Sequence, residues 1–274
     1  MKKIGYFAFC LFALSLWSCE MFRLDNYDAP SETLRGTVVD VATGEPVLTD
    51  QGSEGIRVRL TETSYGDNVE HNPDFYCMSD GTFQNTKLFK GTYNVRIDGP
   101  FIPLVREDPN GVPLANETQN VTLNGKAVDM VFEVQPFLKV VWDGEPTASN
   151  GKISAKLKVT RGVSTEEFKT KIQPTMGNSY SDAYQNVSEV MLMVSYSSSV
   201  GYRARDDRWS TSVKYSGKTF EPLLGTSVSI RSIGEIPSGR TVFVRAAARI
   251  NYATPAGSGT YRWNYSEPIM IIVP

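Results

Sequence analysis

Short segments in which apolar and polar residues alternate, each closed by turn residues, recur along this 274-residue chain. In residues 56–60 and 152–160 nearly every second side chain is apolar. Because successive side chains of a strand point to opposite faces, this period predicts half-buried β-strands. Residues 189–195 (EVMLMVS) are almost continuously apolar, which predicts a central strand buried on both faces. The pattern therefore predicts an all-β protein.

The first nineteen residues predict export. Two lysines precede an apolar run over residues 4–17, which is shorter than the about 20 residues needed to span a bilayer and typical of a signal peptide. The run ends in Leu16-Trp17-Ser18-Cys19, which resembles a bacterial lipobox. We expect residues 1–18 to be a signal peptide, Cys19 to carry the lipid that anchors the chain in the outer membrane, and residues 19–32 to be a tether. The tether's acidic residues resemble a surface-export signal, and a plain linker explains them equally.

The residue inventory argues against catalysis and against nucleic-acid binding. The 28 basic and 30 acidic residues leave a net charge of −2, without the basic excess of a nucleic-acid-binding protein. One histidine, His71, and three cysteines rule out most zinc ligand sets, and we expect no histidine-based triad. The doublets Asp206-Asp207, Glu166-Glu167 and Glu107-Asp108 point to opposite faces if on strands, unlike the paired carboxyls of a glycosidase. We expect no catalytic residue, no metal and no cofactor.

Four motifs stand in order in the first half of the chain: GTVVDVATGEPV, GIRVRL, SDGTF and LFKGTYNVRI. They resemble the carboxypeptidase regulatory-like, or transthyretin-like, domain. The resemblance implies a β-sandwich scaffold over residues 33–136, with Tyr93 in its core and a tight hairpin at Asp80-Gly81. Residues 100–116 form a proline-rich excursion, and long excursions in compact domains are more often functional than short ones.

The end of the chain carries a second resemblance. A strand, a loop containing proline and glycine at residues 233–239, and the strand TVFVRAAA resemble the last third of a fibronectin type III domain. The usual corner tyrosine of that family is Phe243, so its hydroxyl bond to the backbone is lost. The resemblance implies a second sandwich over residues 137–274. We thus expect two tandem antiparallel β-sandwich domains after a lipoprotein signal peptide.

The whole layout resembles an uncharacterised family of Bacteroidetes surface lipoproteins, whose relatives often accompany outer-membrane glycan-uptake machinery. The resemblance implies a non-catalytic protein on the cell surface that binds carbohydrate and works with outer-membrane glycan-uptake proteins. The alternative is a structural or adhesive part of the cell envelope, such as a fimbria-type subunit or an accessory protein that docks on a partner, often by strand addition.

Two segments rich in aromatic residues and arginine supply candidate glycan contacts. Sugar rings pack on flat aromatic faces while nearby polar side chains bond the hydroxyls, and binding residues concentrate on loops held by rigid scaffolds. The candidates in residues 196–215 and 251–265 are Tyr202, Arg205, Trp209, Tyr252, Tyr261, Arg262 and Trp263. The alternative is that these side chains fill a sandwich core or cover strand edges.

Overall fold

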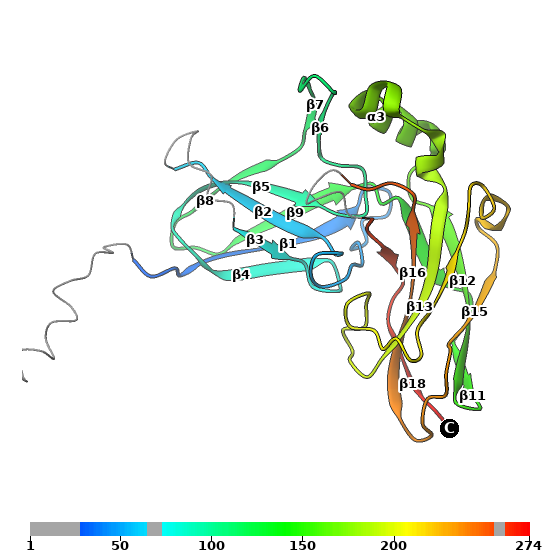
Figure 1. The fold of residues 1–274 in the computed structure, drawn as a ribbon. Coiled ribbons are helices and arrows are strands. Elements are labelled where there is room, and N and C mark those ends of the chain that lie inside the picture. Colours follow the sequence, from blue (N-terminus) through cyan, green and yellow to red (C-terminus); the bar gives the residue numbers. More distant parts are fainter. Residues whose placement is uncertain (1–27, 65–72, 255–260) are drawn as a thin grey trace, which may run out of the picture.

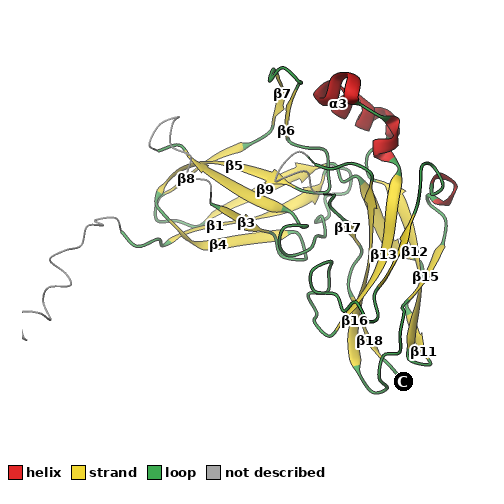
Figure 2. Cartoon of the chain, in the orientation of Figure 1, coloured by secondary structure: helices red, strands yellow, loops and turns green. Residues whose placement is uncertain are grey.

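The computed structural model describes residues 28–64, 73–254 and 261–274. Two β-sheet domains follow each other and meet in an L-shape (Figure 1), and strands make up most of the regular structure (Figure 2). The predicted all-β class is confirmed. The predicted signal peptide and Cys19 lie outside the described residues. None of the helices within the described ranges has the length and apolar character needed to cross a membrane.

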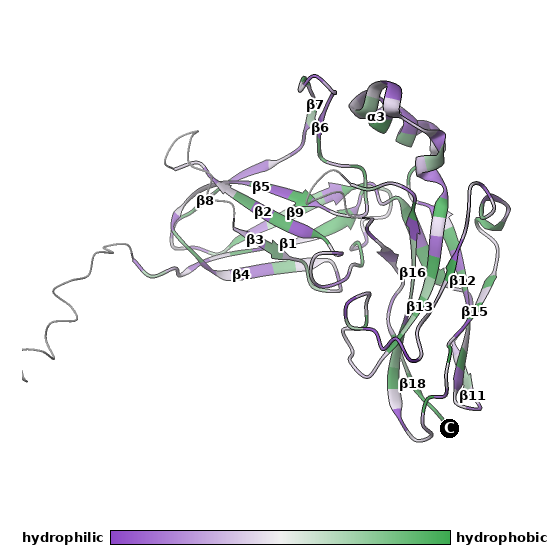
Figure 3. Ribbon diagram, in the orientation of Figure 1, coloured by the Kyte–Doolittle hydropathy of each residue, from purple (hydrophilic) through white to green (hydrophobic). Residues whose placement is uncertain are grey.

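The first domain packs two sheets around one core, with strand orders β4–β1–β9 and β3–β2–β5–β8, and carries a separate β6–β7 hairpin. Hydrophobic and hydrophilic residues alternate along its strands (Figure 3). Tyr93 is buried in this core, as predicted. The described ladders are antiparallel except that β1 and β9 pair in parallel. The strands are β1 Glu32–Asp40, β2 Arg57–Glu62, β3 Asp74–Tyr76, β4 Thr82–Leu88, β5 Gly91–Asp98, β6 Val105–Glu107, β7 Pro113–Asn116, β8 Gln119–Leu123 and β9 Val128–Val134.

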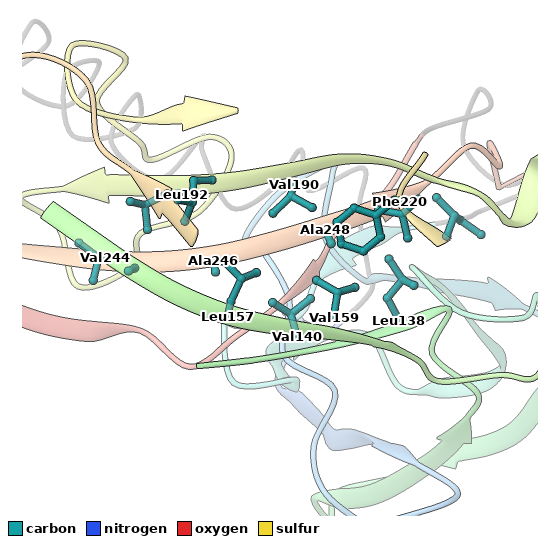
Figure 4. Close-up of a cluster of buried hydrophobic side chains, with 14 of the residues drawn as sticks. Leu138, Val140, Leu157, Val159, Val190, Leu192, Phe220, Val244, Ala246 and Ala248 are labelled. Atoms are coloured by element: carbon teal, nitrogen blue, oxygen red, sulfur yellow. The ribbon is translucent and has the colours of Figure 1, made fainter. Parts of the chain in front are cut away.

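The second domain is also a sandwich. In one sheet β12 pairs with β10 and β11 along one edge and with β15 along the other; in the facing sheet β13 lies between β14 and β16, and β17 and β18 pair with β16. Figure 4 shows the apolar side chains between the sheets. The strands are β10 Leu138–Trp142, β11 Thr147–Ser149, β12 Lys152–Arg161, β13 Val187–Ser195, β14 Thr211–Lys214, β15 Val228–Arg231, β16 Thr241–Ile250, β17 Asn264–Tyr265 and β18 Ile269–Ile272, with short 3-10 turns η1 Gly177–Ser179, η2 Asp182–Gln185 and η3 Glu221–Leu223.

Strand β13 is buried on both faces, as its apolar run predicts. Val190 and Leu192 point into the sandwich core (Figure 4), whereas Met191 and Met193 belong to a separate cluster on the other side of the sheet. Leu48 of the first domain packs against that second cluster. The second face of β13 is therefore covered by a small cluster of mostly second-domain side chains, to which the first domain contributes Leu48.

Within the part of the chain that the structure describes, one α-helix, α3 (Thr165–Met176), stands between β12 and β13, where the sequence predicts only sandwich structure. Ser164 caps it, because its hydroxyl accepts the backbone N–H of Glu167 at 3.1 Å. Phe168 and Ile172, one turn apart, are its buried side chains. With an apolar stripe this narrow and Pro174 within the last turn, the sequence shows little helical period.

Candidate functional site: a cleft between the domains

Arg245 of β16 ties the two domains together. Its guanidinium is fully buried, and it donates to the carbonyl oxygens of Thr49 at 2.7 Å and Ser79 at 3.1 Å, both in the first domain. It also donates to Ser266 at 2.7 Å and lies over the Tyr265 ring at 4.6 Å. A buried charge is tolerated only when it is satisfied in this way, so these bonds hold the domains in one relative orientation.

A first-domain loop, residues 47–55, packs against the second-domain loop that contains Gly201 and Arg203. The Asp50 carboxylate accepts the backbone N–H of Arg203 at 3.1 Å, and the Arg203 side chain contacts Glu54 at 2.6 Å. Burial raises the pKa of Asp50, while the N–H groups of Arg203 and Gln51 favour its charged form. Gly201 permits the close approach, because a Cβ there would lie 2.2 Å from Asp50 Oδ1. The junction is thus tightly fitted.

Four of the seven predicted ligand-contacting residues lie in one stack beside this junction. The rings of Tyr202 and Trp263 stack with centroids 5.8 Å apart, and Arg205 lies 4.2 Å from the Tyr202 ring. Arg249 lies 4.7 Å from the Trp263 ring and 5.6 Å from that of Tyr261. Trp263 is only 1% exposed, whereas Tyr261 is 44% exposed. Tyr261 is therefore the most exposed ring of the stack, and Tyr202 and Arg205 at the other end are half-buried.

The other three predicted residues are buried in different places. Trp209 is 3% exposed, lies in the second-domain core and donates Nε1 to the Glu235 carbonyl at 3.1 Å. Tyr252 packs edge-on against Phe137. Arg262 donates to the Ser53 carbonyl across the junction at 3.0 Å. The seven residues thus do not form one exposed aromatic platform, because both segments fold inward over the sheets.

The β6–β7 hairpin and α3 rise side by side near the boundary of the two domains (Figure 1). A cavity of about 370 Å³ separates them. We call the residues that line it the interdomain cleft: Arg96, Pro103, Val105, Arg106, Glu107, Thr175, Met176, Tyr252 and Ala253. Tyr252 is the one predicted residue among them. The proline-rich excursion at residues 100–116, singled out in the sequence, supplies the hairpin wall.

The interdomain cleft combines an apolar wall with fixed polar groups. Arg106 donates to the Pro103 carbonyl at 2.7 Å and lies 3.5 Å from the Glu117 carboxylate. Arg96 donates to Asp98 at 2.9 Å. Burial raises the pKa of Tyr252 to about 12, so its phenol is neutral at neutral pH. Apolar walls with a few placed polar groups at a domain interface are typical of small-molecule sites.

The carboxylate doublets are engaged in local ion pairs and turns. Hydrogen bonds from Arg208 lower the pKa of Asp206, hydrogen bonds from Gln135 and Lys171 lower that of Glu167, and the backbone N–H of Val112 lowers that of Asp108. The acid of a glycosidase needs a raised pKa, which none of these three has. Across residues 28–64, 73–254 and 261–274, no group of three or more His, Cys, Asp or Glu side chains is placed to hold a metal ion.

A second hollow, of about 530 Å³, lies on the second domain along β12 and β15. Its lining residues are Asp143, Glu145, Thr147, Ser154, Ala155, Lys156, Ser229, Ile230 and Arg231. None of these described lining residues is aromatic, and all belong to one domain. Variants of residues in this hollow therefore serve as controls for variants of residues in the interdomain cleft.

Comparison with known proteins identifies a family model and solved structures that are similar to this chain. The model of the N-terminal domain of DUF3823, a protein of unknown function, matches residues 32–135. The solved structure of a DUF3823 family protein from Bacteroides uniformis is 65% identical, covers 89% of this chain and 100% of its own, and has a TM-score of 0.85. No curated protein matches this chain.

Two more distant structures share the fold with the same coverage of both chains. One, from Bacteroides uniformis, is named as a candidate carbohydrate-binding protein, with 16% identity and a TM-score of 0.61. The other is a DUF3823 family protein from Parabacteroides merdae, with 18% identity and a TM-score of 0.59.

Proposed function

Because this chain belongs to the DUF3823 family, we propose that it is a non-catalytic, carbohydrate-binding lipoprotein of the outer membrane, exposed on the cell surface. The signal peptide and lipidated Cys19 expected from the sequence support the location. The name of a protein with the same fold supports carbohydrate as the ligand class. Outer-membrane glycan-uptake proteins are the proposed partners.

The observation that carries the proposal is the interdomain cleft. Arg106 and Thr175 place polar groups beside the apolar side chains of Val105 and Met176, and a sugar presents hydroxyls and C–H faces to match. The junction around Arg245 holds the two walls in place. A preformed site of this kind loses little conformational entropy on binding.

The direction of the chain fits a surface anchor. Strand β1 begins at the end of the first domain that is remote from the second domain (Figure 1). A lipid on Cys19, joined through the tether of residues 19–32, would therefore hold the first domain nearer the membrane and present the interdomain cleft farther away from it.

The test is a glycan array followed by titration calorimetry, with the chain made without residues 1–18 and with Cys19→Ser. We expect Arg106→Ala to weaken binding about tenfold or more, because hydrogen bonds to charged groups contribute roughly 1.5–3 kcal/mol. Arg231→Ala, in the hollow along β12 and β15, is the matched control and should bind as the parent does. If Arg231→Ala weakens binding and Arg106→Ala does not, the binding site lies in the hollow along β12 and β15. If the chain binds no glycan of the array, the carbohydrate-binding proposal is wrong.

The alternative, a structural or adhesive role, draws support from β18. Met270 and Ile272 on this strand are 59% and 65% exposed, and among the described strands β18 pairs with β16 alone. An open strand edge with exposed apolar side chains can pair with another copy. If this role holds, the chain self-associates in sedimentation experiments and Ile272→Lys makes it monomeric. A parent chain that is monomeric at high concentration contradicts self-association through β18.

A further inference from the structure

Beside the interdomain cleft, two guanidinium groups share one buried carboxylate. Asp98, buried at the end of β5, accepts Arg57 Nη2 at 2.8 Å and Arg96 Nε at 2.9 Å. Arg57 is buried and also contacts Asp74 at 3.3 Å. Arg96 is half-buried and lines the cleft. Asp98 is thus shared between a buried arginine and the arginine that faces the cavity.

Arg262 adds another positive charge near Asp98 and Arg57. It is buried, and it donates to the carbonyl oxygens of Ser53 and Gly55, which are neutral acceptors. Burial lowers its pKa, the charge of Asp98 raises it, and that of Arg57 lowers it, so the three groups act on one another. The nearby Glu54 is already paired with Arg203 at 2.6 Å.

The hairpin wall of the interdomain cleft presents Arg106, which lies on β6. Its salt-bridge partner Glu117 is 3.5 Å away, and the side chain of Glu117 is 54% exposed whereas that of Arg106 is 12% exposed. Glu107 is the one carboxylate among the described lining residues, and it is exposed. Both guanidinium groups that line the cavity share or only loosely contact their carboxylate partners: Arg96 shares Asp98 with Arg57, and Arg106 lies 3.5 Å from Glu117. A cleft with low-dielectric walls strengthens the field of such groups.

From this arrangement we infer that the interdomain cleft selects glycans that carry carboxylates, such as uronic acid residues. The inference rests on the proposed function and names its ligand class. Arginine binds carboxylates through charge-assisted, often bidentate hydrogen bonds. Arg96 and Arg106 bind the carboxylate, while Val105 and Met176 contact the C–H face of the sugar ring.

The experiment compares oligo-uronates with their own methyl esters by titration calorimetry. The probes are trigalacturonate, a mannuronate trimer and a hyaluronan tetrasaccharide, each with its fully methyl-esterified counterpart, so that each pair differs in charge at nearly constant shape. We expect at least one acid to bind about tenfold more tightly than its ester, with the preference shrinking as salt rises. Arg96→Gln and Arg106→Gln should each reduce the preference, and Arg231→Gln should keep it.

The outcomes separate the two proposals. If neutral glycans bind and no acid exceeds its ester, the charge selection is overturned while carbohydrate binding stands. If Arg96→Gln and Arg106→Gln both fold, as judged by circular dichroism, and both keep the full preference, the assignment to this cleft is overturned. If the parent chain binds neither these probes nor any neutral glycan of the array, both proposals fail.

Discussion

The indole of Trp209 is enclosed on several sides. It lies in the second-domain core, its ring meets that of Tyr196 edge-on at 5.1 Å, and Arg208 lies 4.7 Å from it. Its N–H is satisfied by the Glu235 carbonyl. A side chain held in this way stabilises the fold and has no ring face to offer a ligand.

We therefore expect Trp209→Ala to lower the free energy of unfolding by about 3–5 kcal/mol, the usual cost of removing a buried tryptophan. Urea denaturation followed by circular dichroism measures this change. Tyr261→Ala is the control, since that ring is 44% exposed, and it should cost less than about 1 kcal/mol. A Trp209→Ala variant as stable as Tyr261→Ala would contradict the buried position.

The sequence shows where aromatic residues and arginines are concentrated, but it does not show which way their side chains point. The sequence shows that residues 251–265 are aromatic-rich, but Trp263 faces inward because β17 pairs Asn264 with Ala248 of β16, which places Trp263 beside Arg249. Local sequence does not reveal such a register. Arg96 and Arg106 were missed because they lie on separate strands and meet only in the folded chain.

At the scale of elements, α3 forms one wall of the interdomain cleft through Thr175 and Met176. Its position depends on Phe168, whose ring meets Phe137 edge-on at 5.8 Å, and on Lys171, which bonds to Gln135 near the domain boundary. The helix is thus fastened to both the core and the interdomain segment.

Removing the helix cap tests how far this element supports the cleft. Ser164→Ala deletes the acceptor for the Glu167 N–H and should cost about 1 kcal/mol of stability, measured by urea denaturation. Ser164→Asp retains a capping oxygen and should restore the parent value. If Ser164→Ala and Ser164→Asp are equally destabilised, the cap does not stabilise α3.

Elements with strong alternation were predicted well, and weakly patterned ones were not. The period of apolar residues correctly predicts the burial of the apolar side chains in residues 56–60 and the burial of β13 on both faces. The parallel pairing of β1 with β9 departs from the expected antiparallel sandwich, because alternation specifies a strand's faces and leaves its neighbour's direction open. Helix α3 was missed for its narrow apolar stripe.

At the scale of the whole molecule, the junction makes two sandwiches one unit. Arg245 crosses from β16 to the carbonyls of Thr49 and Ser79, and Asn264 donates to the Pro100 carbonyl at 3.1 Å while accepting the Leu138 N–H at 3.2 Å. These bonds join residues far apart in the sequence, which is why composition and periodicity cannot reveal them.

Differential scanning calorimetry tests this coupling. The parent chain should unfold in one cooperative transition. Arg245→Met leaves buried carbonyl groups unsatisfied, so it should lower stability by roughly 3–5 kcal/mol and split the transition in two. Gly201→Ala, which drives a Cβ against Asp50, should act in the same direction. Two separate transitions in the parent chain would contradict a rigid junction.

The central claim is that the interdomain cleft binds carbohydrate, and hydrogen–deuterium exchange with a saturating glycan tests it most directly. Glycan binding should slow amide exchange in the β6–β7 hairpin, at the end of α3 around Thr175, and around Tyr252, and leave β12 and β15 unchanged. Protection confined to β12 and β15, or to the Tyr261 end of the aromatic stack, would contradict the account.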